Sequence, residues 1–493
     1  MIPFAPWLPD LPISLPDKCN DIENVTPFEV AYKPTRKVSP TTPALALDPN
    51  EAETFLSLDG AVVNVVGTAT GLFIYDSVAN LWTNVTRAVG GAYAVPAGNR
   101  WSFAQYQNYI FATNGFDTVQ RYQIGVSSTF ENRVEIPIGK YLATSRLFVI
   151  MAHLATNGRE MAWCALGDPS DWTFSAATLA DHQIISDKGD ITGISSGDLV
   201  VIIQRDGINR MVFAGPPLVF NIERFSTNVG CFVDGSFTQY GDLLFFLSTS
   251  GFKMLRAGQE LDNIGDLKVD AWIERNLNFT NHGLSNATVD IANKLYVFNM
   301  PSSGSDICDT QVVYHWPTGR WSKWRQDLSL VCTLTSGVTY TLDNIDGVFG
   351  ANLDAMDISL DSPILSTIGL TAMAGFPNTG ADAKKMGFFT GVVLAAVLET
   401  GDINFIPGRR ALLRNIFPLV ESTGTLLLSV TPSVRNSLYV PSIPQAAGTL
   451  IGYRKVPLRA AGRFHRMRVG IEEGVEWQFA IGLDEPTISQ EAA

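Results

Sequence analysis

Apolar and polar positions along residues 51–335 repeat as a short hairpin pattern. A turn rich in Gly, Asn or Asp leads into an apolar run, as in Gly71-Leu72-Phe73-Ile74-Tyr75, and a second turn and strand follow. The pattern occurs in six segments, at 71–75, 108–111, 146–150, 197–202, 241–246 and 293–298. Its spacing is roughly 35–50 residues, the period expected for propeller blades or similar arrays. Because one strand pair cannot bury its apolar face alone, we expect these units to stack into roughly six blades.

Few segments predict a helix. No long stretch places apolar residues at a spacing of about 3.6 with caps at both ends, and only a short helix near 269–275 is expected. Five tryptophans recur at the ends of the hairpin units. We expect each indole to fill the space where blades meet and to donate its N–H to a backbone carbonyl. These residues are Trp82, Trp101, Trp172, Trp321 and Trp324.

The two ends of the chain differ from this middle region. Residues 1–50 are rich in proline, which removes backbone donors and fixes φ, so they predict an extended arm lying across another surface. Trp7 and Leu8 are its expected anchors, and a poorly ordered terminus is the alternative. From about 386 to 485 the strands become longer, at 392–398, 411–418, 425–430, 464–469 and 476–482. They predict a β-sandwich-like domain.

The predicted protein is therefore all-β and is divided into three parts. An arm covers 1–50, a β-propeller covers 51–370, and a C-terminal β-sandwich-like domain covers 371–493. Residues 336–385 are rich in Gly, Asp and Ser, and they either close the array or link it to the next domain. A length of 493 residues agrees with more than one domain.

Charge and cysteine usage exclude several classes of protein. The net charge of −13 argues against a generic nucleic-acid binder. The five cysteines are far apart and form no CxxC pair, so reduced thiols are expected instead of a disulfide framework or a zinc site. The N-terminus resembles no signal peptide, and the longest apolar stretch, near 387–398, is too short to span a bilayer. No membrane insertion is predicted.

The motifs that suggest chemistry lack the context that each chemistry needs. Residues 193–197 match G-x-S-x-G, but a β-strand is expected after them where a nucleophile elbow requires a helix. The five histidines show no metal-ligand spacing. The acidic stretch 343–347, with Asp354 and Asp357, lacks the regular spacing of a calcium loop, and turn chemistry explains it equally well. We predict no catalytic residue, cofactor or metal site, and expect the protein not to be an enzyme.

Basic residues gather between Arg409 and Arg468, where only Glu421 opposes them. They are Arg409, Arg410, Arg414, Arg435, Arg454, Lys455, Arg459, Arg463, Arg466 and Arg468. Three interpretations stay open: a face that docks on an acidic neighbour, contacts with phosphates, and a solvated edge. The residues selected as a candidate docking interface are Trp7, Arg409, Arg410, Arg414, Arg463, Arg466 and Arg468.

Short segments at both ends resemble one protein family. At the N-terminus they are 6–10, 24–27 and 32–34, and near the C-terminus they are 408–411, 417–420 and 462–468, with Trp477 and Gly482. This layout of arm, propeller and sandwich is similar to that of the packaged-DNA stabilisation, or tail nozzle, proteins of short-tailed bacteriophages (podoviruses). The propeller segment matches that family by general character only.

The resemblance implies a structural virion protein, assembled in the host cytoplasm and located in the tail. It implies a homo-oligomeric ring of roughly six copies, a hexamer, below the portal and its adaptor. That ring continues the channel for double-stranded DNA without sequence-specific binding, and helps to retain and eject the genome. A needle or plug protein and tailspikes or fibres are the other implied partners. Net acidity suits such a channel because it repels phosphate along the wall.

Two other classes of function are weighed against this one. A carbohydrate-active or receptor-binding β-propeller, either a tail-associated glycan hydrolase or an adhesin, predicts a pocket at the propeller axis with paired carboxylates and exposed aromatic residues. A cellular scaffold of the kelch type predicts a Gly-Gly doublet in each blade, and only Gly90-Gly91 provides one.

Overall fold

The computed structural model describes residues 1–335 and 371–490, apart from 78, 186–187, 217, 257–258 and 423. Nearly all regular structure in this part of the chain is β-strand. Its one α-helix, α1 (Asp270–Asn276), lies where the sequence predicts a short helix. The short 3₁₀ turns among these residues are η1 (Asp234–Ser236), η2 (His282–Leu284) and η5 (Gly452–Arg454). The all-β prediction is therefore confirmed, and the fold is propeller-like, as its sheets show.

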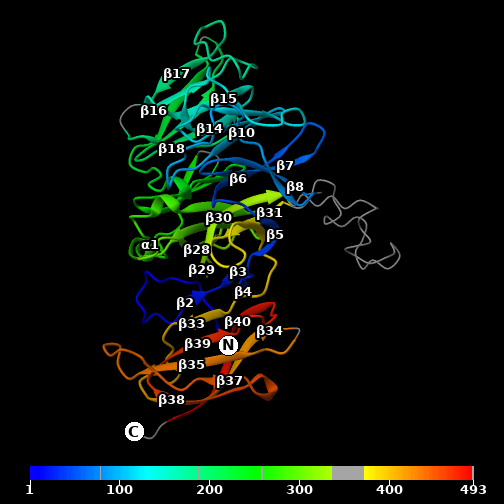
Figure 1. Ribbon diagram of the computed structural model, residues 1–493. Helices are drawn as coiled ribbons and strands as arrows, with labels where there is room; N and C mark the ends of the chain where they lie inside the picture. The colour runs from blue at the N-terminus through cyan, green and yellow to red at the C-terminus, as the bar shows by residue number, and fades with distance from the viewer. Residues whose placement is uncertain are drawn as a thin grey trace.

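Seven four-stranded antiparallel sheets make up the larger part of the described residues, in the upper half of Figure 1. Six of them each use four strands that are consecutive in the chain. The first three are β6 (Pro49–Leu56), β7 (Val62–Thr68), β8 (Leu72–Asp76) and β9 (Leu81–Asn84); β10 (Ser102–Tyr106), β11 (Tyr109–Thr113), β12 (Gln120–Gln123) and β13 (Glu131–Asn132); and β14 (Gly139–Ser145), β15 (Phe148–Leu154), β16 (Asn157–Trp163) and β17 (Asp181–Ile184).

The next three sheets follow the same order. They are β18 (Ile191–Ile194), β19 (Leu199–Gln204), β20 (Ile208–Phe213) and β21 (Phe220–Ser226); β22 (Thr238–Tyr240), β23 (Leu243–Ser248), β24 (Gly251–Arg256) and β25 (Glu260–Asn263); and β26 (Asn286–Asp290), β27 (Leu295–Pro301), β28 (Cys308–His315) and β29 (Arg320–Arg325). Each of the six hairpin segments found in the sequence lies in a different one of these six sheets.

The seventh sheet combines distant parts of the chain. It contains β30 (Leu328–Thr335), β31 (Thr371–Pro377) and β32 (Lys385–Phe388), and its outer strand is β5 (Ser39–Ala44) from the N-terminal arm. The sequence predicts only roughly six such units because this one lacks a continuous hairpin pattern. The predicted domain limits at residues 50 and 371 do not coincide with the limits of the sheets. The strand β5, which lies before residue 50, pairs with β32 of the seventh sheet, and β31, which begins at residue 371, pairs with β30.

The first strands of neighbouring sheets are joined by side-chain hydrogen bonds. Ser102 of β10 accepts from the Leu142 backbone N–H of β14 at 2.9 Å. The hydroxyls of Thr288 in β26 and Thr333 in β30 lie 2.8 Å apart. The Thr335 N–H of β30 donates to Thr54 Oγ1 of β6 at 2.9 Å, so the last sheet contacts the first.

The predicted packing of the five tryptophans is confirmed in its hydrogen bonding. Each indole N–H donates to a backbone carbonyl at 2.9–3.0 Å. The donor and acceptor pairs are Trp82 with Pro43, Trp101 with Thr68, Trp172 with Pro169, Trp321 with Ile264, and Trp324 with Val25. Trp101, Trp172, Trp321 and Trp324 are also buried. These side chains therefore fill the space within and between sheets.

Two six-stranded sheets form the lower part of the molecule in Figure 1. One contains β1 (Ile2–Pro3), β3 (Val25–Phe28), β4 (Ala31–Pro34), β34 (Ala411–Glu421), β38 (Val456–Gly462) and β40 (Phe479–Gln490). The other contains β2 (Cys19–Glu23), β33 (Ala396–Thr400), β35 (Leu428–Arg435), β36 (Ile443–Pro444), β37 (Gly448–Thr449) and β39 (Phe464–Ile471). Four of these strands come from the N-terminal arm.

The buried residues of the two sheets alternate with exposed ones and join a core that extends into the propeller-like part. In β38 the pattern is strict from Val456 to Ala460, with Val456, Leu458 and Ala460 buried and the residues between them exposed. The same apolar cluster includes Trp7 of the arm and Phe252 of β24. The two parts of the molecule therefore share one continuous core, which the arm completes.

Candidate functional site

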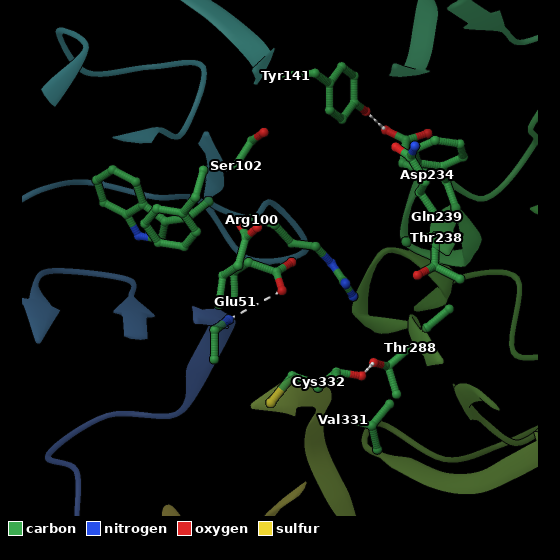
Figure 2. Close-up of a pocket in the computed structure, with 18 of the residues that line it drawn as sticks. Glu51, Arg100, Ser102, Tyr141, Asp234, Thr238, Gln239, Thr288, Val331 and Cys332 are labelled. Atoms are coloured by element: carbon green, nitrogen blue, oxygen red, sulfur yellow. Dashed lines mark hydrogen bonds between the residues drawn. The ribbon is translucent and has the colours of Figure 1, made fainter. Parts of the chain in front are cut away.

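All seven first strands line one cavity of about 560 Å³ (Figure 2). Residues of β6, β10, β14, β18, β22, β26 and β30 contribute to it, so the cavity lies where the seven sheets converge. Its walls carry several hydroxyl and amide groups, including Thr192, Gln239 and Thr333, together with charged side chains. Aromatic side chains, among them Phe103 and Tyr240, also line it. Concave sites that mix apolar surface with a few polar groups are typical of ligand pockets.

Two glutamates of β6 line this cavity, separated by one residue. Glu51 accepts a hydrogen bond at 3.2 Å from the Ala52 backbone N–H, and desolvation raises the pKa of its carboxyl although Arg100 opposes this. Glu53 is exposed to the cavity but surrounded by protein. Desolvation first, and the nearby Glu51 carboxylate second, raise the pKa of Glu53 to about 8. A carboxyl of this kind exchanges a proton near neutral pH.

On the opposite wall one carboxylate holds two donors. Asp234 Oδ2 accepts from Lys140 Nζ at 2.7 Å. It also accepts from the Tyr141 hydroxyl at 2.7 Å (Figure 2). Desolvation and the Asp234 charge both raise the pKa of Tyr141, which therefore stays a neutral donor. These bonds hold Lys140 and Tyr141 in place at the cavity wall.

Arg100 crosses from one side of this region to the other. Its Nη2 donates to the Leu284 carbonyl at 3.1 Å and also to the Ser285 carbonyl. Beside it, the backbone of Gly98 packs directly against Gly283, and a Cβ at either position would meet the other chain segment. A second cavity of about 370 Å³ shares Gly98, Asn99, Arg100 and Gly283 with the first, so this contact separates the two.

The arginines selected from the sequence divide into two groups in the structure. Arg466 donates to Asp402 Oδ1 at 2.9 Å, and Arg468 donates to Glu399 Oε2 at 3.1 Å and to Asp21 Oδ2 at 3.3 Å. Both are therefore held by carboxylates of the same chain. Arg409, Arg410, Arg414 and Arg463 are exposed and lie near or on β34 and β38.

Trp7 lies in the core. It is 1% exposed, and its ring lies edge-on to that of Trp272 with the centroids 5.1 Å apart. The arm is also held by Asp10, whose carboxylate accepts from the backbone N–H groups of Ala271 and Trp272 at 2.8 Å. In this chain Trp7 anchors the arm to the propeller-like part.

The remaining sequence motifs have structural roles or lie outside the described residues. Ser195 of the G-x-S-x-G motif is buried, and its Oγ accepts from the Val201 N–H at 2.7 Å inside a β-hairpin. All five cysteines are buried free thiols. Among the described residues no group of three His, Cys, Asp or Glu side chains is arranged to hold a metal ion. The acidic stretch 343–347, Asp354 and Asp357 fall in the undescribed segment 336–370.

The two glutamates of the cavity were not predicted from the sequence. The alternation of Glu51 and Glu53 at the start of a strand is the one signal in the sequence that places both on the same side. That they face a cavity depends on six other sheets, whose arrangement no local pattern determines. Within the described residues, no helix is long and apolar enough to cross a membrane.

Comparison with known proteins gives only loose structural likeness. No protein-family model matches this chain, and no curated protein matches it significantly. Among solved structures, the chain is similar to the extracellular domain of BT4673 from B. thetaiotaomicron at 9% identity and a TM-score of 0.42, covering 79% of this chain and 44% of that one.

Two further structures show likeness of the same low degree. Dihydro-heme d1 dehydrogenase NirN in complex with DHE matches at 13% identity and a TM-score of 0.33, over 87% of this chain and 79% of that one. A chain of the mitotic checkpoint complex matches at 9% identity and a TM-score of 0.37, over 63% of this chain and 95% of that one.

Proposed function

We propose that this protein is a structural subunit of a short-tailed phage tail, a tail nozzle protein that forms a ring and is not an enzyme. Roughly six copies would make a hexameric ring that continues the DNA channel below the portal and adaptor and helps to retain and eject the genome. In this proposal each subunit contains a closed seven-bladed β-propeller and a β-sandwich. The sequence resemblance described above supplies the family, and the path of the arm supplies the physical support.

The observation that carries the proposal is the way in which the arm joins the two parts. Its strands β1, β3 and β4 pair in one sandwich sheet, β2 pairs in the other, and β5 completes the seventh propeller-like sheet. Between them, the Asn24 N–H donates to the Lys323 carbonyl at 2.9 Å, and Asn24 Oδ1 accepts from the Arg325 N–H at 2.8 Å. Because the propeller-like part and the sandwich share one core and are both paired with strands of the arm, they resist motion relative to each other. A subunit that lines a DNA channel requires this rigidity.

The DNA path in this proposal lies between subunits. The cavity within one subunit holds about 560 Å³ and is bordered by the Arg100 contact, so it does not admit a duplex. Double-stranded DNA would instead pass through the centre of the ring without sequence-specific binding. The net charge of −13 favours a wall to which phosphates do not adhere. Portal-side adaptor proteins, a needle or plug, and tailspikes or fibres are the proposed partners in the virion tail.

Native mass spectrometry of the purified full-length protein, alone and with the adaptor, tests the proposal. The expected result is one closed oligomer of about six subunits, seen in electron micrographs as an annulus with an open centre. A protein that stays monomeric both alone and in the presence of the adaptor contradicts the proposal. Mass measurement over a range of protein concentrations separates a closed ring from open-ended association.

The axial cavity favours a second candidate function, a carbohydrate-active or receptor-binding propeller. Glu51 and Glu53 provide two carboxyls, the second with a pKa of about 8, and Tyr240 and Phe103 add aromatic surface to the same cavity. Carboxylate pairs and aromatic platforms are the groups that glycan sites use. Binding to a glycan array and release of fragments from host polysaccharide test this candidate.

The glycan test has a matched pair of variants. The E51Q/E53Q double variant is expected to lose binding or hydrolysis, whereas E131Q, on β13 away from the cavity, is expected to keep it. A wild-type protein that neither binds nor cleaves any glycan contradicts the second candidate and leaves the structural one in place.

A further inference from the structure

The Glu53 carboxyl lines the cavity between the seven sheets without a hydrogen-bond donor from the protein. Within the described residues no hydrogen bond to either of its oxygens is found. Glu51, two residues earlier on β6, accepts from the Ala52 N–H, and the charge of Arg100 favours its ionised form. Because alternate residues of a strand point to the same side, both carboxyls belong to one wall. Of the two, only Glu51 is supported by protein groups.

The opposite wall shows how this cavity holds an ammonium group (Figure 2). Lys140 Nζ donates to Asp234 Oδ2 at 2.7 Å and lies 5.5 Å from the centroid of the Tyr141 ring. Both contacts favour the cation, since the carboxylate accepts from its N–H groups and the face of the ring attracts its charge. On this wall the chain itself supplies the cation.

The wall around Glu53 has an acid and an aromatic ring but no ammonium group from the described part of the chain. Phe103 lines the cavity and packs against Phe55, with the ring centroids 6.1 Å apart. Phe55 follows Glu53 by two residues on β6, so these two side chains point to the same side of the strand. The guanidinium of Arg100 already donates to two backbone carbonyls at the end of η2. A cation from outside the chain would complete this wall.

The charges that line the cavity balance when Glu53 is protonated. Lys140 is paired with Asp234, and Arg100 offsets Glu51. The other titratable side chains of the lining come from β14, η2 and β30, and they are Tyr141, His282 and Cys332. Burial raises the pKa of the tyrosine and of the cysteine well above their usual values, so both stay neutral. The histidine ring is bound through Nδ1 to the Phe279 carbonyl at 2.7 Å. Ionised Glu53 therefore adds one negative charge without a partner in the lining.

The dimensions of the cavity suit an organic ligand in preference to a metal ion. Its volume of about 560 Å³ falls within the range of roughly 300–1,000 Å³ found for small-molecule pockets. In the described ranges no three His, Cys, Asp or Glu side chains are arranged to hold a metal. Tyr240 and Ile291 line the cavity and are each 38% exposed, so it is open to solvent beside them. Their apolar surface suits a short hydrocarbon chain.

We infer that this cavity binds a small aliphatic amine, whose ammonium group is held by the Glu53 carboxylate beside the Phe103 ring. The ammonium N–H groups donate to the carboxylate, and the proton that leaves the Glu53 carboxyl passes to solvent. The ligand keeps its own charge throughout. This inference does not depend on the proposed ring, and its ligand differs in charge from the neutral glycans of the second candidate function.

Binding of an amine is expected to depend on pH. Desolvation and the charge of Glu51 raise the pKa of Glu53 to about 8, so most of the protein has this carboxyl protonated at pH 6–7. Because the ammonium favours the ionised form, its affinity should rise by about tenfold from pH 6 to pH 7 and level off above about pH 8. Close to one proton should be released for each amine bound at pH 6–7.

Isothermal titration calorimetry of the full-length protein tests the inference with putrescine, a four-carbon diamine, in about 0.15 M salt, which screens weak attraction to the acidic surface. Titrations in two buffers that differ in ionisation enthalpy measure the proton release. We expect saturation at one putrescine per chain. Butane-1,4-diol has the same length without the charge, and it should give no measurable binding.

Glu53→Gln keeps the shape of the side chain and removes its charge. At pH 8 this variant should bind putrescine at least roughly tenfold more weakly than the wild type, and its affinity should no longer change between pH 6 and pH 8. Glu131→Gln removes an exposed carboxylate of β13, away from the cavity, and should bind like the wild type. Thermal unfolding of both variants checks that the fold is intact.

Each other outcome overturns the inference. Equal binding of putrescine and butane-1,4-diol would exclude an ammonium site and favour the glycan candidate. Putrescine binding that is equally strong in Glu53→Gln and the wild type would place the amine elsewhere on the protein. A wild-type protein that does not bind putrescine at pH 8 contradicts the inference directly. Failure of the protein to form a ring contradicts the proposed function and leaves the amine site unaffected.

Discussion

The indole ring of Trp7 lies edge-on to that of Trp272, with the two centroids 5.1 Å apart and the ring planes at 72°. Trp7 belongs to the N-terminal arm, and Trp272 belongs to α1 in the propeller-like part. This contact joins segments that are far apart in the chain, at the place where the two parts of the molecule share their core. The proline-rich arm therefore contributes to the core of the fold instead of lying on its surface.

Replacing Trp7 by alanine is expected to lower the free energy of unfolding by about 3–5 kcal/mol, because the side chain is 1% exposed and its removal leaves a cavity. Trp7→Phe should lower it less, since no hydrogen-bond partner of the Trp7 indole N–H is found among the described residues. Urea unfolding measures both changes. Equal stability of the wild type and Trp7→Ala would show that the arm is not anchored here.

Gly387 of β32 is expected to tolerate no side chain. A Cβ at this position would collide with the Ser39 carbonyl of β5, whose backbone pairs with β32. We expect Gly387→Ala to destabilise the protein by about 1–3 kcal/mol and to loosen the arm toward proteases. Gly424→Ala, where a Cβ meets nothing within 4 Å, is the control and should change stability by no more than about 0.5 kcal/mol. Limited proteolysis with mass mapping detects cleavage between β5 and β6.

Asp402 is expected to be essential for the stability of the sandwich. Its side chain is 1% exposed and accepts from Arg435 and Arg466, so Asp402→Asn leaves two guanidinium groups without their shared anion. The expected loss is about 3–5 kcal/mol in the free energy of unfolding. Arg414→Met, on the exposed side of β34, should cost less than about 0.5 kcal/mol. Similar losses in both variants would contradict the division of the basic segment into held and outward-facing arginines.

Glu53 is expected to make the protein less stable as pH rises. Because the pKa of Glu53 is raised to about 8 in the folded state, folding favours its protonated form. Its stabilising contribution is complete below the pKa of an unfolded glutamate, near about 4.3, and is lost as pH rises toward about 8.

Glu53→Gln removes the ionisable group, so the variant should gain stability relative to the wild type at pH 8–9 and differ little at pH 4. Thermal unfolding across this pH range measures the difference. The exposed Glu131→Gln serves as the comparison, and a parallel pH dependence for all three proteins would show that Glu53 is not responsible.

Local sequence patterns identify six of the seven sheets because each of those sheets uses four strands that are consecutive in the chain. In five of them the second strand is an apolar run that follows a turn, as at Leu199–Gln204 and Leu243–Ser248. The seventh sheet has no such local signature because its outer strand comes from Ser39–Ala44, and the segment 336–370 separates β30 from β31. Strand pairing over such a distance leaves no local period to detect.

The candidate sites were also difficult to predict, because their residues are brought together by contacts between distant parts of the chain. Arg466 and Arg468 look unpaired in the sequence because Glu421 is the only acidic residue between Arg409 and Arg468, but Asp402, Glu399 and Asp21 contact them across strands. In the sequence Glu51 and Glu53 look like ordinary polar positions of a strand. In the structure they line a cavity to which six other sheets also contribute residues. In both cases the environment is built by residues far away in the chain.

The sequence by itself determined that this protein is nearly all β, because hairpin turns and two-residue alternation are local and act within each unit. It also predicted that five tryptophans at the ends of the hairpin units donate their N–H groups to backbone carbonyls, because strand ends place such acceptors beside an indole. Only the tertiary structure decided which carboxylates meet which arginines, where the arm inserts its strands, and which side chains face the cavity between the seven sheets. Those relationships depend on long-range pairing and on burial, and both are properties of the whole packed chain.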